Sequence, residues 1–139
     1  MELSLDTAGD VAGIGLSEQG VALTELRWRC PRMQGAQLLP AVDEMLRRSG
    51  VSKHDLDAIF VPVGGGGLLA GVCLAAAHLG SAVRIIGVEP DGARRYARSL
   101  SAGRPVEVPP SDSVADGWRG QRPGEVILPI VRHRVDELI

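Results

Sequence analysis

Four consecutive glycines, residues 64–67, form the stretch of this sequence best suited to chemistry. They follow a short apolar run, residues 59–63, and precede an almost wholly apolar run, residues 68–79. Glycine lacks a Cβ atom, so backbone N–H groups there can approach a ligand closely. A helix that begins just after them offers free N–H groups and a partial positive charge, which together favour an anion such as a phosphate. We therefore predict an anion-binding loop, with a plain flexible turn as the alternative; its residues are Gly64, Gly65, Gly66, Gly67 and Leu68.

The remaining polar residues predict no catalytic group. Lys53, the single lysine beside 14 arginines, lies in a polar turn, where nothing would lower the pKa of its amine enough for a nucleophile. Asp6 and Asp10 are typical of turn-forming carboxylates, with a phosphate- or magnesium-facing pair as the alternative. Glu89 follows a buried strand, where open α/β sheets bind ligands, but we predict a solvent-facing carboxylate.

Composition limits the class of protein. The 139 residues are 45% hydrophobic, which is typical of one globular domain. A net charge of −2 provides no broad basic field, so we expect no nucleic-acid partner. The longest apolar run falls far short of about 20 residues and no signal peptide is visible, so we expect no membrane association and a cytoplasmic location.

The first half predicts an antiparallel meander followed by one helix. Strands are expected over residues 3–7, 11–16 and 21–29, where short extended patterns are separated by turns. A helix is expected over residues 37–49, with Pro40 in its first turn and Gly50 as its stop. Its apolar stripe consists of Leu38, Leu39, Val42, Met45 and Leu46.

The second half predicts a parallel βαβ unit. Apolar strands over residues 58–63 and 83–88 enclose the helix over residues 68–79. Asp91 is expected to cap a further helix that ends at Gly103, and a last helix is expected from Pro123 through Leu138. The predicted fold class is α/β: a single domain with one mixed sheet, in which the meander is extended by parallel strands, and with helices on both faces.

Residues 58–139 resemble the C-terminal part of fold-type II pyridoxal-phosphate enzymes, the threonine/serine dehydratase (ammonia-lyase) and serine racemase group. The matching segments occur in the family's order and spacing: residues 61–68 (VPVGGGGL), 86–90 (IGVEP), 98–103 (RSLSAG), 114–117 (VADG) and 123–125 (PGE). The resemblance implies pyridoxal phosphate as cofactor, with its phosphate held by backbone N–H groups of the tetraglycine loop. It also implies that the segment Ala115-Asp116-Gly117 lies near the cofactor ring.

Two departures from that family limit what the resemblance implies. The family's lysine, which forms a Schiff base with the cofactor, lies in a Ser-x-Lys-type motif that these 139 residues lack. In the family, the counterparts of Glu89 and Ala93 can join a divalent-cation site, but its acidic position is Arg95 here. A cationic side chain opposes metal binding, so we predict neither a catalytic residue nor a metal site.

Residues 1–57 instead resemble the start of the TsaB family, which takes part in making threonylcarbamoyladenosine on tRNA. The similar segments are residues 3–7 (LSLDT), 37–40 (QLLP), 50–52 (GVS) and 56–59 (LDAI). The resemblance implies an actin/RNase H-like fold and a scaffold that binds a catalytic homologue. The chain is thus interpreted as two halves, residues 1–57 and 58–139, joined near Leu56-Asp57-Ala58 as in a natural or engineered chimera.

Three functions follow as hypotheses. The first is an incomplete phosphate-binding half-domain, without catalysis, that binds pyridoxal phosphate non-covalently or another phosphate-like anion. The second is a TsaB-like interaction module that forms a homodimer or binds a TsaD-type partner, and the third is a chimera with no evolved function. A residual threonine/serine ammonia-lyase activity is kept as an alternative.

Overall fold

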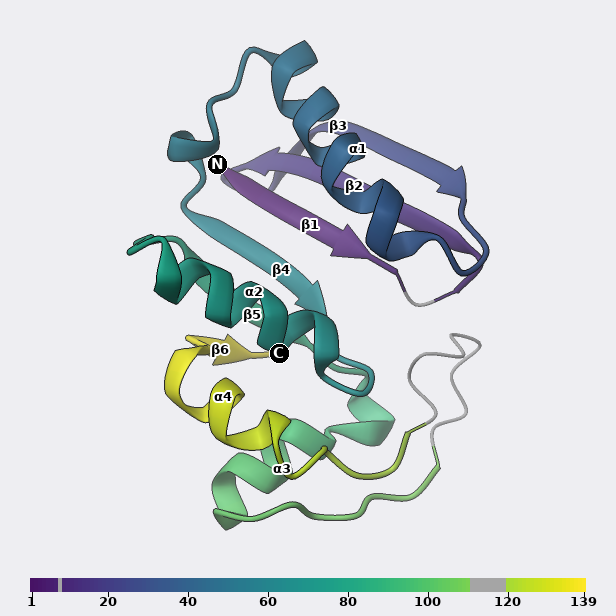
Figure 1. Ribbon diagram of the computed structural model, residues 1–139, viewed down its shortest axis with the longest axis vertical. Helices are drawn as coiled ribbons and strands as arrows, with labels where there is room; N and C mark the ends of the chain where they lie inside the picture. Colours follow the sequence, from purple (N-terminus) through teal and green to yellow (C-terminus); the bar gives the residue numbers. More distant parts are fainter. Residues whose placement is uncertain (8, 111–119) are drawn as a thin grey trace.

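A computed structural model describes residues 1–7, 9–110 and 120–139. Strands and helices alternate along the second half of the chain, after a three-stranded start (Figure 1). The elements are β1 (Glu2–Asp6), β2 (Val11–Glu18), β3 (Val21–Arg29), α1 (Gln34–Ser49), η1 (Lys53–Asp55), β4 (Ala58–Pro62), α2 (Gly67–His78), β5 (Arg84–Val88), η2 (Asp91–Ala93), α3 (Arg95–Ala102), α4 (Ile127–Arg134) and β6 (Glu137–Leu138). No helix in these ranges is long and apolar enough to cross a membrane.

One sheet contains all the strands of the described residues, in the order β3-β2-β1-β4-β5-β6. β1, β2 and β3 pair antiparallel, whereas β4 runs parallel to β1, β5 to β4 and β6 to β5. The predicted α/β class, with an antiparallel meander extended by parallel strands in a single mixed sheet, is confirmed. The meander is continuous with the parallel part because β1 lies between β2 and β4 (Figure 1).

The helices of the two hydrophobic clusters cover the same face of this sheet. Leu3, Ile14 and Leu16 pack with α1, while Val61 and Ile85 pack with α2 and α4. Leu3 lies beside Ile59 in register, and Ile59 packs against both clusters, so the strand residues of both clusters point to one side. The sequence predicted helices on both faces. The two clusters place α1, α2 and α4 on one face of the sheet. The opposite face of the meander carries polar and small residues.

Helix α1 begins three residues earlier than predicted. It runs from Gln34 to Ser49, so Pro40 lies inside the helix rather than in its first turn, at the cost of one backbone hydrogen bond. Gly50 ends the helix in the left-handed conformation, as predicted, with φ 67°. The stripe is narrower than predicted, because Leu39 remains 74% exposed.

The predicted helix over residues 123–138 is wrong at both ends. The helix observed there is α4, Ile127–Arg134, and the chain then becomes extended and adds β6 to the sheet. Asp136 holds this strand start, because its N–H donates to Ile85 O (2.9 Å) and its carboxylate accepts from Ile85 N (2.6 Å). Leu138 lies over Gly87, where a Cβ would meet its Cδ2 at 2.5 Å, so a glycine in β5 makes room for it.

Candidate functional site

The glycine loop lies at the carboxyl end of β4 and leads directly into α2. Val63 is fully buried and its N–H donates to Val88 O (2.9 Å), so the loop leaves the sheet from a fixed point. Gly66 caps α2 with φ 85°, a conformation that favours glycine, and its carbonyl accepts from Ala70 N (2.8 Å). The loop is therefore an ordered turn at the start of a helix.

The loop offers backbone N–H donors, and part of it faces solvent. Gly65 and Gly67 are exposed, and a Cβ built on either would meet nothing within 4 Å. Among the described residues, no protein acceptor receives a hydrogen bond from the N–H groups of Gly65, Gly66, Gly67 or Leu68. Four successive N–H groups at the positive end of a 12-residue helix form the environment that a phosphate oxygen requires.

Tyr96 contacts the buried side of the loop and fixes its position. Its Oη donates to Gly65 O (2.9 Å), and its ring fills the space beside Gly66, where a Cβ would overlap the hydroxyl oxygen. Tyr96 is fully buried in the cluster that includes Val61 and Leu69. The sequence offered no sign that an aromatic residue 30 positions after the loop would be its support.

Two charged side chains beside Tyr96, Glu89 and Arg95, complete the support, and the environment of Glu89 was predicted wrongly from the sequence. Glu89 is 5% exposed, and its two oxygens accept from Tyr96 N (2.8 Å) and Ala97 N (2.9 Å). The prediction of a solvent-facing carboxylate is wrong, because Glu89 caps the first turn of α3. Asp91, the predicted cap, instead begins the separate turn η2.

Arg95 occupies the position where the resembled family places an acidic metal ligand. Its side chain is fully buried, with Nη1 donating to Gly120 O and Nη2 3.5 Å from Val63 O, the residue before the loop. Burial lowers the pKa of this guanidinium, and the charge of Glu89 opposes that shift. The side chain thus places a positive charge and hydrogen-bond donors next to Val63, the residue before the loop.

The remaining predicted residues lie away from the loop. Lys53 belongs to η1, before the start of β4, while the glycines follow its end. The five residues of β4, at about 3.3 Å each, therefore separate the two by about 16 Å. The segment Ala115-Asp116-Gly117 lies outside the described residues.

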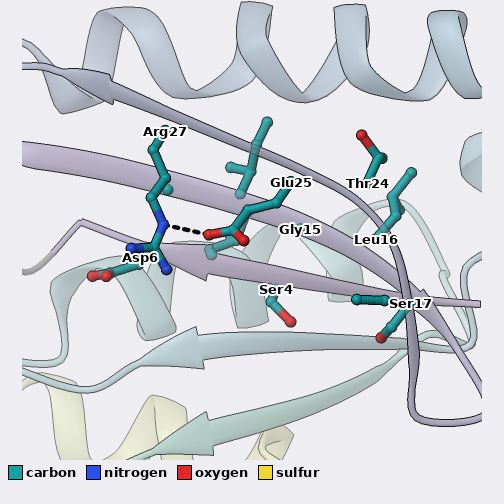
Figure 2. A pocket seen from close by; sticks show the side chains of 12 residues that line it. Ser4, Asp6, Gly15, Leu16, Ser17, Thr24, Glu25 and Arg27 are labelled. Carbon is teal, nitrogen blue, oxygen red and sulfur yellow. Dashed lines mark hydrogen bonds and ion pairs between the residues drawn. The ribbon is translucent and has the colours of Figure 1, made fainter.

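A hollow of about 270 Å³ lies on the face of the meander opposite to α1 (Figure 2). Gly13 and Gly15 form its floor, and charged and polar side chains surround them, including Asp6 and an ion pair between Arg27 and Glu25. Asp10 does not line it, and its backbone carbonyl accepts from Cys30 N (2.7 Å). The two aspartates therefore do not form one site.

Tyr96 makes the support of the loop sensitive to alkaline pH. Burial raises the pKa of its phenol, because the charged form loses hydration, and only the neutral hydroxyl can donate to Gly65 O. For a raised acid pKa, the contribution to stability is complete below the unfolded value of about 10 and is lost as pH rises through the folded value. We expect the free energy of unfolding to fall above about pH 10, with a smaller fall in Tyr96→Phe.

Phenolate absorbance measures this titration directly, because the chain contains one tyrosine. Denaturant unfolding of both proteins at each pH provides the stability. A phenol that titrates in the folded protein at its unfolded pKa would contradict the burial argument.

Most of the chain is similar to a known protein family. The sequence model of the pyridoxal-phosphate dependent enzymes matches residues 36–139. A serine racemase from Arabidopsis thaliana is 42% identical over 86 residues, which cover 62% of this chain and 26% of that protein. The crystal structure of a threonine deaminase from T.th. aligns with a TM-score of 0.59 and 41% identity, covering 76% of this chain and 36% of its own.

A second kind of neighbour covers a larger share of the chain. YeaZ from Pseudomonas aeruginosa aligns with a TM-score of 0.53 and 26% identity, covering 81% of this chain and 55% of its own. The family match that begins at residue 36 starts inside α1, upstream of the predicted junction at Leu56-Asp57-Ala58. The chain spans about a quarter to a third of the length of the curated relatives it matches.

Proposed function

Because this chain belongs to the family of pyridoxal-phosphate dependent enzymes, we propose that its glycine loop binds the phosphate group of pyridoxal phosphate. The observation that carries the proposal is the row of backbone N–H groups at the start of α2 that have no protein acceptor among the described residues. A phosphate there would accept hydrogen bonds and lie against the positive end of the helix dipole. The residues that would hold it are Gly64, Gly65, Gly66, Gly67 and Leu68.

The proposed binding is non-covalent and without catalysis by these 139 residues. When bound, pyridoxal phosphate supplies an electron sink for reactions at amino-acid carbons. For catalysis the cofactor would have to be attached to a lysine, and Lys53 lies at the opposite end of β4 from the loop. This chain's own residues would bind and orient the phosphate. The loop would donate hydrogen bonds, while Tyr96 holds the Gly65 carbonyl and Arg95 the carbonyl of Val63, just before the loop. Activity as a threonine/serine ammonia-lyase is the alternative.

Substitution of Gly67 by aspartate tests the loop. The residue is exposed, has open space and begins α2, so an aspartate fits there and favours the helix, but its charge repels a phosphate. We expect Gly67→Asp to weaken binding of pyridoxal phosphate and inorganic phosphate by about tenfold or more, since like charges a few Å apart cost about 1–2 kcal/mol near a surface. Amide NMR shifts of the loop during titration measure both affinities.

The matched control is Gly71→Asp, one turn further along α2, where the glycine is also exposed with open space. It adds the same charge to the same helix and should bind nearly as well as the unchanged chain. Lys53→Ala should leave the cofactor's absorbance spectrum unchanged. Loss of a Schiff-base absorbance band in that variant would overturn non-covalent binding, and equal affinities for both aspartate variants would overturn the site.

A TsaB-like interaction module remains the second candidate, favoured by the structural likeness to YeaZ over 81% of the chain. In this hypothesis residues 1–57 and 58–139 derive from different families, and the shared helix–strand–glycine-loop order allowed them to join. The match to the pyridoxal-phosphate dependent enzymes begins at residue 36, so residues 36–57 are common to both resemblances and only residues 1–35 would derive from the TsaB-like side alone. Sizing chromatography with and without a TsaD-type protein tests this role; no shift would exclude that partner.

A further inference from the structure

The outer edge of β3 is the longest uncovered edge of the sheet. β3 is the terminal strand and spans nine residues, whereas β6, at the other edge, has two. Among the described residues no strand pairs with the outer side of β3, so its outward N–H and C=O groups are available to another strand. An exposed edge of this length can pair with a further chain, and the charges and the register shift of β3 limit the registers in which it can do so.

The residues of β3 divide cleanly between the two faces. Leu26 and Trp28 lie opposite Ile14 and Ala12 of β2, both buried beneath α1, so they point to the helix-covered face. Glu25 and Arg27 lie opposite Gly15 and Gly13, on the open face that Figure 2 shows. Leu26 is nevertheless 41% exposed, and Val21 and Leu23 are more exposed still, because no other strand of the described residues covers this edge. The strand thus presents apolar side chains and alternating charges at its edge.

We propose that this edge pairs with the β3 edge of a second copy of the chain, antiparallel about a two-fold axis at Leu26. An axis perpendicular to the sheet brings residues of the same face opposite each other. Glu25 then faces the partner's Arg27, Arg27 faces the partner's Glu25, and Thr24 faces the partner's Trp28. The two Leu26 side chains meet at the axis on the helix-covered face and cover each other.

The charge sequence selects this register over its neighbours. An axis at Glu25 would place the two Glu25 carboxylates opposite each other, and an axis at Arg27 would oppose two guanidinium groups. Like charges directly opposite each other on adjacent strands are destabilising, whereas opposite charges stabilise the pair. The register shift near Ser17 and Leu16 confines regular pairing to the part of β3 beyond Leu23, which contains all the residues of the proposed contact.

The contact is independent of the glycine loop. The loop lies beyond the carboxyl end of β4, with β1 and β2 between that strand and β3. A dimer of this kind joins two six-stranded sheets into one continuous sheet. Because edge pairing buries a small area, the association should be weak and concentration-dependent.

Charge exchange between two variants tests the register. In Glu25→Arg both positions 25 and 27 are arginine, and in Arg27→Glu both are glutamate, so each variant opposes like charges in its own dimer. We expect sedimentation velocity to show a concentration-dependent dimer for the unchanged chain and a loss of affinity of about tenfold or more for each variant alone. An equimolar mixture of the two should restore the dimer, since every pair across the axis is then opposite in charge.

Matched controls carry the same charge changes on a different part of the surface. Glu107→Arg and Arg104→Glu alter exposed residues beyond α3 and should leave the dimer unchanged. Circular dichroism confirms that all four variants fold. A monomeric unchanged chain at every concentration, dimers in both single variants, or a mixture that stays monomeric would each overturn the proposal.

Discussion

Gly66→Ala should destabilise the protein by about 3 kcal/mol or more and displace the glycine loop. Two costs add: an alanine at φ 85° loses about 1–2 kcal/mol, and overlap in a well-packed region costs about 1–3 kcal/mol. The new Cβ would overlap Tyr96 Oη and lie 2.8 Å from a methyl group of Ile127, so neither neighbour can simply turn away. Denaturant unfolding measures the loss, and phosphate titration measures its consequence for the site.

Gly67→Ala is the matched control for this prediction. It adds the same methyl group one residue later, into open space at the first position of α2, and replaces a glycine in a helix. We expect it to be neutral or to stabilise by up to about 1 kcal/mol. Gly66→Ala should also cost less in a Tyr96→Phe background, because the nearest overlapping atom is then absent. Equal stability of the two alanine variants would show that Tyr96 does not hold the loop.

Glu89→Ala should destabilise the protein by about 3 kcal/mol. The carboxylate accepts two short hydrogen bonds, from Tyr96 N and Ala97 N, and hydrogen bonds to charged groups contribute about 1.5–3 kcal/mol each. Its removal leaves both N–H groups without their acceptor at the start of α3 and removes a negative charge from the positive end of that helix. Because α3 carries Tyr96 and Arg95, phosphate affinity at the loop should fall in the same variant.

Two controls separate the cap from a general loss of charge. Glu89→Gln keeps one acceptor oxygen and should lose about half as much stability, while Glu107→Ala, at an exposed position, should stay within about 0.5 kcal/mol of the unchanged chain. Urea unfolding at neutral pH measures all three. A Glu89→Ala protein as stable as Glu107→Ala would contradict the capping role.

Most of the fold could be predicted because its elements carry local signals. The strands of the meander, the helix that Gly50 ends and the βαβ unit around residues 64–67 all follow from apolar periodicity and from glycine positions. A capping box of Ser52 and Asp55 is another such local feature, with the His54 N–H donating to Ser52 Oγ. These features depend on residues close together in the chain.

The errors concern elements that distant residues decide. β6 formed in place of a helical end because the edge of β5 was available to Glu137 and Leu138, and no local pattern reports a free sheet edge. Glu89 is buried because the first N–H groups of α3, those of Tyr96 and Ala97, donate hydrogen bonds to its carboxylate. Propensity carries no information about either partner, so tertiary contacts overrode it.

The sequence by itself determined where the proposed anion-binding loop lies. Four glycines between an apolar strand and an apolar helix require a loop with accessible N–H groups at a helix start, and this holds for any packing of that unit. Only the tertiary structure decided how that loop is held. Tyr96, Arg95 and Glu89 lie 22 or more residues beyond it. Tyr96 reaches the Gly65 carbonyl, Arg95 the Val63 carbonyl just before the loop, and Glu89 the N–H of Tyr96, because the first turn of α3 lies beside the end of β4. Burial of these side chains is tolerated since each makes at least one hydrogen bond, a condition that the folded chain alone can satisfy.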